Sequence, residues 1–376
     1  MTHPTCIPLF KSDAALAAPA VSFTAAPIRE LSPEQLSTWS RFQQNNPSLD
    51  SPFFRPEFAL AVAAHCDDVE VAVAKRHGCD VGYFPIHREP GNTAQPVGRS
   101  LSDFHGIVAP EDTEFSPAEL IRQCRLKALH FNHLLTSQPA FAAHHWITAP
   151  SQYMNLSHGF EHYQEERRKS GSKILKQARR KARKIEREVG SLRFVPHEYS
   201  DERFQTLIDW KIAQYRRIRS VNHLAESWRI DTLRRIALTQ STLFSGMLSS
   251  LYAGDRLIAI HLGILSGGVL HCWFPTYSRD LAKYSPGLIF WLYLAQEAER
   301  LGITRIDLGK GRERFKRSLG TGTTQLAEGS VDLRPAVARV RQGLMRTREW
   351  IHSSVFRGPV RGVIRGVRCW TMYRSW

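Results

Sequence analysis

Residues 244–320 read FSGMLSSLYAGDRLIAIHLGILSGGVLHCWFPTYSRDLAKYSPGLIFWLYLAQEAERLGITRIDLGKGRERFKRSLG and carry the clearest structural pattern in the chain. Three apolar runs come first, over 244–253, 257–265 and 269–277, with glycine-containing turns between them. Such runs with such turns predict an antiparallel meander of strands. A strongly apolar helix over 288–300 and a short strand over 304–308 are expected to follow. This order places the N-terminus of a helix at the end of a sheet.

The start of that helix predicts an anion site. Ser285 is expected to cap the helix with its hydroxyl, and Pro286 suits the first helical position. Gly287 allows a ligand to approach the backbone closely. Free N–H groups and the helix dipole would then face a phosphate-bearing ligand, although an ordinary capped helix is the competing interpretation.

The composition indicates a polyanionic partner without choosing one. The chain has 376 residues, and its 51 Lys and Arg against 35 Asp and Glu give a net charge of +16. Such a charge favours a cofactor of the CoA type, a nucleic acid or an anionic membrane surface. Six cysteines without a Cys-x-x-Cys pair are typical of a reducing compartment. We expect a protein of the cytoplasm, or one peripheral at the inner membrane face, because neither a signal peptide nor a membrane-length apolar run is present.

The pattern along the chain predicts five parts. They are a disordered start (1–22), an N-terminal domain (23–156), a basic connecting helix (157–190), a C-terminal catalytic domain (191–333) and a basic amphipathic tail (334–376). Each domain gives the order hairpin, helix, strand, which suggests a duplication. His130-x-x-His133 and His144-His145 lack further ligands at metal-binding spacing, so no metal is expected.

Two basic segments have alternative interpretations. Residues 172–189 predict a helix with a narrow apolar stripe, made by Ile174, Ala178, Ala182, Ile185 and Val189. Its basic face is either simply solvated or an electrostatic rim for a phosphate-rich ligand. The tail over 356–370 interleaves arginine with apolar residues, so it either lies on an anionic membrane or is a disordered tether.

Several motifs together resemble the GNAT-superfamily acyltransferases of the CelD / BioF2-like branch, with a looser kinship to the FemAB peptidyltransferases. The resemblance covers residues 25–333. It rests on Pro52-Phe53-Phe54-Arg55-Pro56-Glu57-Phe58, Leu101-Ser102-Asp103-Phe104-His105-Gly106, Ala259-Ile260-His261-Leu262-Gly263, Trp273-Phe274-Pro275-Thr276-Tyr277, Tyr284-Ser285-Pro286-Gly287 and the run from Asp307 to Arg317. The usual GNAT pyrophosphate signature, Gln/Arg-x-x-Gly-x-Gly/Ala, is missing, and the Ser-Pro-Gly turn takes its place.

The resemblance implies a mixed α/β (α+β) fold of two GNAT-like halves, each a mixed, mostly antiparallel sheet flanked by helices. It also implies acetyl-CoA or another acyl-CoA as co-substrate, bound by residues around the helix start: Tyr284, Ser285, Pro286, Gly287 and Leu288. The acceptor would be an amine on a small molecule or glycan, in particular an amino sugar or a precursor of polysaccharide or cell envelope.

Three of the four candidate catalytic residues lie at or beyond the ends of the parallel strands, 269–274 and 304–308, that should splay in such a sheet. Glu313 is the first candidate base because it follows a strand end and two glycines, and Asp307 is the second. His261 is a further candidate, although a mid-strand histidine is more often part of the core, and Tyr277 could protonate the leaving thiolate. The candidate substrate-binding residues are Lys310, Arg312, Lys316, Asp103 and His105.

Two other functions stay open at this stage. A FemAB-like transferase would take its aminoacyl group from charged tRNA, which the basic connecting helix and the net charge favour. A catalytically degenerate relative would act as a membrane-associated scaffold through the basic tail. Nucleic acid is otherwise not expected as a partner.

Overall fold

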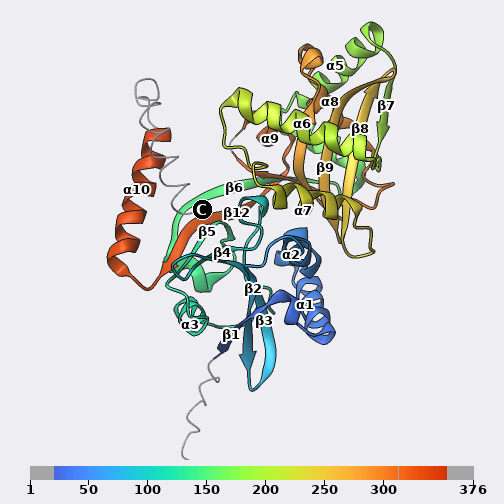
Figure 1. Ribbon diagram of the computed structural model, residues 1–376. Coiled ribbons are helices and arrows are strands. Elements are labelled where there is room, and N and C mark those ends of the chain that lie inside the picture. The colour runs from blue at the N-terminus through green and yellow to red at the C-terminus, as the bar shows by residue number, and fades with distance from the viewer. Residues whose placement is uncertain (1–20, 312, 354–376) are drawn as a thin grey trace, which may run out of the picture.

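The computed structural model describes residues 21–311 and 313–353 (Figure 1). Arg312, most of the predicted disordered start and the predicted tail over 356–370 lie outside the described residues. The strands are β1 (Ser22–Pro27), β2 (Val69–Arg76), β3 (Cys79–Glu89), β4 (Thr93–Pro96), β5 (Ala128–Leu135), β6 (His145–Asn155), β7 (Leu192–Val195), β8 (Ser245–Ala253), β9 (Arg256–Ser266), β10 (Val269–Tyr277), β11 (Arg305–Lys310) and β12 (Gly322–Asp332). The α-helices are α1 (Pro33–Asn45), α2 (Pro56–Ala63), α3 (Pro117–Gln123), α4 (Gly159–Lys169), α5 (Ile174–Glu188), α6 (Asp201–Ile218), α7 (Ser227–Leu238), α8 (Pro286–Glu297), α9 (Arg314–Leu319) and α10 (Pro335–Ser353).

The strands form one sheet in the order β1-β2-β3-β4-β5-β12-β6-β11-β10-β9-β8-β7. Among the described strands only β4–β5 and β10–β11 pair in parallel, and every other neighbouring pair is antiparallel. Each parallel pair is joined by a crossover that contains a helix, α3 in the first half of the chain and α8 in the second. The predicted mixed α/β fold, with a mostly antiparallel sheet flanked by helices, is confirmed.

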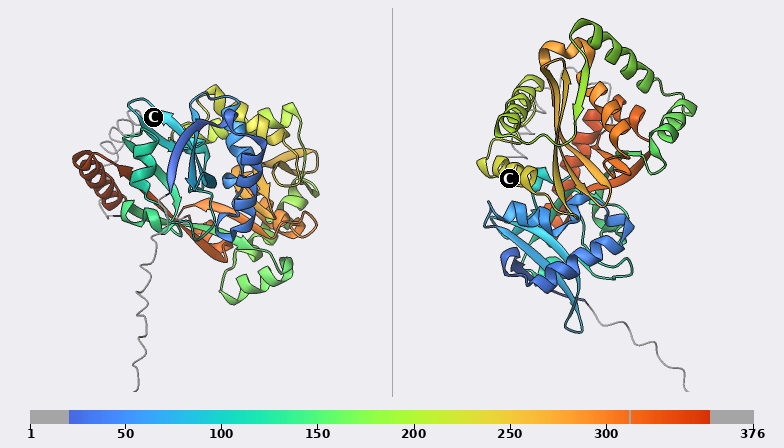
Figure 2. Two further views of the ribbon diagram at one scale, coloured as in Figure 1. Left: turned by 90° about the horizontal axis from the view of Figure 1, so that it is seen from below. Right: turned by 90° about the vertical axis from the view of Figure 1, so that its right-hand side faces the viewer.

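The two halves exchange strands where they meet. β12 lies between β5 and β6, although the sequence places it after β11, and β6 pairs with both β12 and β11. The late strand β12 therefore extends the sheet of the first half, and the earlier strand β6 extends the sheet of the second half. Figure 2 shows the two halves joined through this continuous sheet. The residue boundaries predicted for separate domains stay a prediction.

Local sequence signals explain most helix starts. Ser32 caps α1, and Gln35 completes a capping box by accepting from the backbone N–H of Ser32, as the Ser-Pro-Glu-Gln motif predicts. The predicted apolar stripe of α5 is turned inward, because Ala178, Ala182 and Ile185 are buried and Ile174 and Val189 are partly buried. Leu175, outside that stripe, is buried as well, while most of the basic side chains stay exposed. The helix therefore packs by a narrow face and offers a charged face to solvent.

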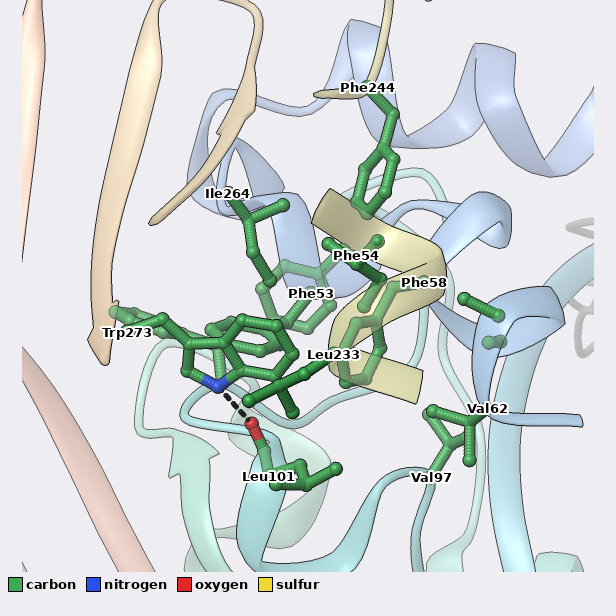
Figure 3. Packing of buried hydrophobic residues seen from close by; sticks show 14 of the residues in the cluster. Phe53, Phe54, Phe58, Val62, Val97, Leu101, Leu233, Phe244, Ile264 and Trp273 are labelled. Atoms are coloured by element: carbon green, nitrogen blue, oxygen red, sulfur yellow. Dashed lines mark hydrogen bonds between the residues drawn. The ribbon is translucent and has the colours of Figure 1, made fainter. Parts of the chain in front are cut away.

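A shared aromatic core joins the two halves (Figure 3). The rings of Phe53 and Phe58, from the first half, lie about 6 Å from the indole of Trp273 in β10. The indole Nε1 of Trp273 donates to the carbonyl of Leu101 at 2.7 Å, so a polar contact fixes the same junction. Aromatic packing and one buried hydrogen bond thus hold the loop after β4 against β10.

Candidate active site

The parallel strands β10 and β11 part after three residue pairs. Their register runs from Val269↔Arg305 to His271↔Asp307, while β10 continues to Tyr277. A bulge at Trp273 shifts β10 against β9 directly after this point. Diverging strands leave backbone N–H groups without a ladder partner between them, and such groups can polarise a carbonyl oxygen. The splayed strands predicted from the sequence are therefore present.

In the first half the equivalent position is filled by the chain itself. β4 and β5 pair only at Thr93↔Ala128 and Ala94↔Leu129, and His105 then pairs in parallel with Leu134. The N–H of His105 donates to the carbonyl of His133 at 2.8 Å, which continues the ladder where β4 has ended. The loop that fills this position carries Asp103 to the second half.

The start of α8 differs from the predicted cap. Ser285 has a left-handed backbone, with φ 56° and ψ 58°, and its hydroxyl makes no capping hydrogen bond. Its carbonyl still accepts from the N–H of Leu288 at 3.0 Å, so Ser285 begins the helix through its backbone alone. The prediction of a Ser285 side-chain cap is wrong, because the 3₁₀ turn over Arg279–Tyr284 forces a left-handed exit.

Gly287 lies half-buried in the first turn of α8, next to Tyr277. A Cβ atom built on Gly287 would lie 3.6 Å from Cδ1 of Tyr277, an ordinary contact distance. The predicted cofactor-binding glycine and the predicted thiolate acid therefore meet at one place. By contrast, Ser116 caps α3, the matching helix of the first half, and Glu119 lies in its first turn, so that helix start is unsuited to an anion.

Basic side chains surround the start of α8. Helix α5 packs against α8, and Nζ of Lys181 donates to the carbonyl of Lys283. The hydroxyl of Tyr284 donates to Glu188 at 2.6 Å, and the ammonium groups of Lys283 and Lys184 lie 4.7 and 5.8 Å from the Tyr284 ring centre. Tyr284 is therefore buried and links the end of α5 to the start of α8, and the ammonium groups of Lys184 and Lys283 lie close to its ring.

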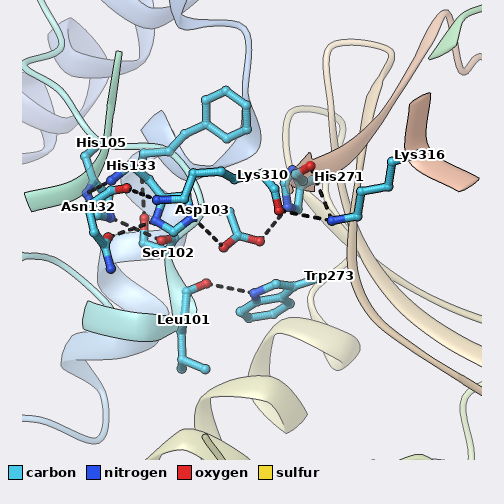
Figure 4. A network of polar contacts seen from close by, with 12 residues as sticks. Leu101, Ser102, Asp103, His105, Asn132, His133, His271, Trp273, Lys310 and Lys316 are labelled. Carbon is cyan, nitrogen blue, oxygen red and sulfur yellow. Dashed lines mark hydrogen bonds and ion pairs between the residues drawn. The ribbon is translucent and has the colours of Figure 1, made fainter. Parts of the chain in front are cut away.

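A polar network at the junction of the halves is centred on Asp103 (Figure 4). The fully buried His271 in β10 donates from Nε2 to the Asp103 carboxylate at 2.9 Å. Nε2 of His133 lies 3.7 Å from the other carboxylate oxygen. Burial opposes the charge of Asp103, but the hydrogen bond from His271 and the nearby cationic groups outweigh it and hold the Asp103 pKa well below its usual range. Asp103 is therefore a fixed anion whose side chain is still about one quarter exposed.

Two lysines bring positive charge to this network. Nζ of Lys310 donates to the carbonyl of Asn132, and Nζ of Lys316 donates to the carbonyl of Lys310 at 3.1 Å. Gly309, at the end of β11, lies between Lys316 and Asp103, since a Cβ built on it would be 3.7 and 3.9 Å from their polar atoms. Three predicted substrate-binding residues, Asp103, Lys310 and Lys316, are thus gathered at the splay.

His105 supports this network from the inside. Its Nε2 donates to the carbonyl of Ser102 at 3.1 Å, and its Nδ1 accepts from the N–H of His133 at 3.3 Å. These bonds define a neutral ring, and burial, assisted by the charge of Lys310, lowers the His105 pKa to about 3. Because His105 is almost fully buried, it orders the loop around Asp103.

The candidate catalytic residues occupy different environments. Glu313 is half-exposed before α9, with its carboxylate 3.7 Å from Nζ of Lys316. Asp307 is buried and paired with Arg305 at 3.1 Å. His261 is fully buried between the rings of Phe290 and Trp291, and burial lowers its pKa to about 3. Only Glu313 and Tyr277 therefore have side chains open to a ligand, and the catalytic roles of all four stay predictions.

Sequence reasoning missed three residues of the site. His271 and His133 were passed over, the first within an apolar strand and the second as half of an unconvincing metal pair. Lys211 in α6 was also missed; its Nζ donates to the carbonyl of Pro275 at 3.1 Å, and burial lowers its pKa to about 8. The one sequence signal for His271 was that a second histidine, besides His261, stands within an apolar strand. Among the described residues no three His, Cys, Asp or Glu side chains are grouped to hold a metal ion.

Comparisons with known proteins agree with this geometry. Residues 172–317 match the model of the acetyltransferase (GNAT) domain family, whereas no curated protein matches the chain. The structure of FemX is similar, with a TM-score of 0.54 and 10% identity over 82% of this chain and 98% of that chain. So is the C-terminal domain (DUF2156) of a protein described as a lysylphosphatidylglycerol synthetase, from Agrobacterium fabrum, with a TM-score of 0.50 and 14% identity over 84% and 97%.

These likenesses extend the fold across both halves, and the family match falls on the half that contains the splayed strands and α8. The narrower CelD / BioF2-like branch stays a prediction. Residues 172–317 are therefore similar to a GNAT-type acetyltransferase domain, and the protein is an acyltransferase.

Proposed function

We propose that the protein transfers an acyl group from acyl-CoA to an amine. The observation that carries this proposal is the splay of β10 and β11 beside a helix start that no side chain caps, where Gly287 and Tyr277 meet. The donor diphosphate would lie against the backbone N–H of Gly287 and the positive end of the α8 dipole, with the cations of α5 around it. The thioester carbonyl would then point into the splay.

Acyl transfer needs groups that stabilise an oxyanion, protonate the leaving thiolate and accept a proton from the amine. The amine nitrogen attacks the thioester carbon, the carbon–sulfur bond breaks, and an amide and a thiol are formed. Backbone N–H groups of the splayed strands would stabilise the oxyanion. The hydroxyl of Tyr277 would give its proton to the leaving thiolate, and the amine proton would pass to Glu313.

We assign Asp103 to the charge that develops on the amine. A carboxylate with a strongly lowered pKa is a weak base, so proton removal is not its task. It is instead a permanent negative charge that binds an ammonium group and stabilises the attacking nitrogen as it becomes positive. His271, which is fully buried, positions this carboxylate.

The acceptor class follows from resemblance and charge. The CelD / BioF2-like branch implies an amino sugar or a precursor of polysaccharide or cell envelope, and Asp103 suits an amine on such a molecule. Lys310 and Lys316 would contact acidic or phosphorylated groups of the same acceptor. The first half would therefore supply part of the acceptor site, while the second half binds the donor.

Adding acetyl-CoA to the purified protein tests the donor. A ligand present at about 100 times its Kd stabilises the folded state by about 2.7 kcal/mol, so the melting temperature is expected to rise. Inorganic diphosphate is the control for nonspecific anion binding and is expected to raise it less. Unchanged melting with acetyl-CoA and with longer acyl-CoA would contradict the proposal.

Replacing Gly287 with valine is expected to weaken acetyl-CoA binding at least tenfold. The new Cβ fits beside Tyr277 at 3.6 Å, so the fold tolerates it, but the branched side chain covers the amides at the start of α8. Gly343→Val is the matched control, because Gly343 is also helical and nothing lies within 4 Å of its built Cβ. Titration calorimetry gives both affinities. Equal affinity in the two variants would place the donor elsewhere.

Replacing Glu313 with glutamine is expected to lower kcat about tenfold, below the usual effect of a general base, because water can partly replace an exposed side chain. Acetyl-CoA affinity should not change. Steady-state kinetics with an amine acceptor measure both effects, and an unaltered kcat would remove Glu313 from the catalytic residues.

Transfer of an aminoacyl group from charged tRNA is the second candidate function. The exposed basic face of α5, next to the start of α8, favours it. In that case tRNA would bind with an affinity that falls steeply with salt, and acyl-CoA would give no thermal stabilisation. The two titrations therefore separate the candidates.

A further inference from the structure

Exposed apolar side chains gather on and just before α10. Nine large hydrophobic residues are exposed in the described part of the chain, and four of them lie between residues 333 and 344. Leu333, Val337, Val340 and Leu344 follow one another at helical spacing, with exposed fractions of 38, 37, 65 and 45%. They therefore form one apolar stripe that the described part of the chain leaves uncovered.

Helix α10 stands at the outside of the molecule, beside β12 and β6 (Figure 1). Its side against the sheet is marked by Ala338, Gln342 and Met345, which are half-buried at helical spacing on a different face from the stripe. Nη1 of Arg341, at the border between the two faces, contacts the ring of His130 in β5, at 3.2 Å from Nδ1. The helix is thus held on the sheet by one side, and the apolar stripe lies on another. Over residues 21–311 and 313–353, none of the helices has the length and apolarity of a membrane span.

The charge around the stripe is one-sided. Residues 334–376 contain ten arginines, one glutamate and neither lysine nor aspartate, which is a net charge of +9 out of +16 for the chain. Within the helix, Arg339 and Arg346 are exposed. An apolar stripe combined with arginines is the pattern of a helix that lies in the plane of an anionic bilayer surface.

This charge disfavours two other partners that could cover the stripe, a second copy of the chain and the segment after residue 353. A second copy of the chain, docked through the same helix, would bring a segment of charge +9 against its equal. The segment after residue 353 carries five of the ten arginines and no acidic residue, so it too would be repelled from α10. A surface that is both negative and able to receive apolar side chains has neither problem.

We propose that α10 docks the protein on an anionic lipid surface, with Val337, Val340 and Leu344 inserted among the lipids and the arginines against their phosphates. This inference does not depend on the acyl donor or acceptor. It places the helix at the membrane and leaves the splayed strands and α8 free to bind ligands.

Sedimentation of the full chain with vesicles tests the inference. We expect at least tenfold stronger binding to phosphatidylcholine vesicles that contain about 30% phosphatidylglycerol than to phosphatidylcholine alone, and loss of most binding at high salt. The double variant Val340→Asp, Leu344→Asp should bind the anionic vesicles no better than the unchanged protein binds phosphatidylcholine alone. Leu243→Asp, at an exposed residue outside α10 with a similar exposed fraction of 41%, should bind like the unchanged protein.

Each remaining outcome has a definite meaning. Absence of binding by the unchanged protein overturns the inference, and undiminished binding by the double variant does so as well, because the segment after residue 353 would then suffice. A change of mass in light scattering, without vesicle binding, would assign the stripe to self-association instead. Thermal stabilisation by acetyl-CoA is measured on the same variants and should be unaffected, which keeps this test separate from that of the acyl transfer.

Discussion

Asp103→Asn is expected to lower kcat about a hundredfold, within the range seen when one preorganised electrostatic group is removed from an active site. The asparagine oxygen can still accept from His271, so the loop should keep its place while the negative charge is lost. The affinity for acetyl-CoA should hardly change, because the donor is assigned to the start of α8. Steady-state kinetics with an amine acceptor and calorimetry with acetyl-CoA give the two numbers.

The pH dependence distinguishes this role from that of a general base. The Asp103 pKa lies well below its ordinary value, so the carboxylate is charged throughout the range in which activity is measured. The ratio of kcat between the unchanged protein and Asp103→Asn should therefore stay constant from about pH 5 to pH 9. A ratio that falls towards one at pH 6 would show that Asp103 exchanges a proton during turnover. Asp67→Asn, in an exposed ion pair with Arg29, is the control and should be fully active.

Much of the second half could be predicted from its sequence because its order depends on local signals. Paired turn residues between apolar runs gave the meander β8-β9-β10, and Pro286 with the apolar run after it gave α8 and hence the parallel step to β11. The exchange of β6 and β12 has no such signal. It depends on which edge of a sheet is free after both halves have formed, and the local sequence of a strand does not indicate which edge it will join.

The candidate site was only partly predictable for a similar reason. Gly287 and Tyr277 belong to local patterns, whereas the contact of Asp103 with His271 joins residues 168 positions apart. The apolar residues around His271 in β10 suggest a core strand, and nothing near it in the sequence indicates the carboxylate that it meets. Ser285 was misjudged because capping preferences describe helices entered from extended backbone, and here a 3₁₀ turn precedes the helix.

The junction that creates the site also depends on one guanidinium group. Arg305, at the first residue of β11, binds Asp50 from the first half with both terminal nitrogens, at 2.5 and 2.7 Å. Its Nε lies 3.1 Å from Asp307, whose side chain is only 2% exposed. Burial raises the pKa of Asp50, and Arg305 opposes that rise. The cation therefore pairs with one carboxylate from each half, at the residue where the pairing of β10 with β11 begins.

Arg305→Met is expected to destabilise the folded protein by about 3–5 kcal/mol, because a buried carboxylate is left without its counter-ion. The matched control is Arg300→Met, which removes an exposed ion pair with Glu297 and should destabilise the folded protein by less than about 1 kcal/mol. Without Arg305 the Asp50 pKa rises further above its unfolded value, so the folded state gains stability as that carboxyl binds a proton at low pH. The loss of unfolding free energy in Arg305→Met relative to the unchanged protein, measured by chemical denaturation, should therefore grow as pH rises from about 4 to 7. Adding Asp307→Asn to this variant should restore part of the lost stability. A deficit that matches Arg300→Met at every pH would mean that the aromatic core alone holds the two halves in the register that opens the splay.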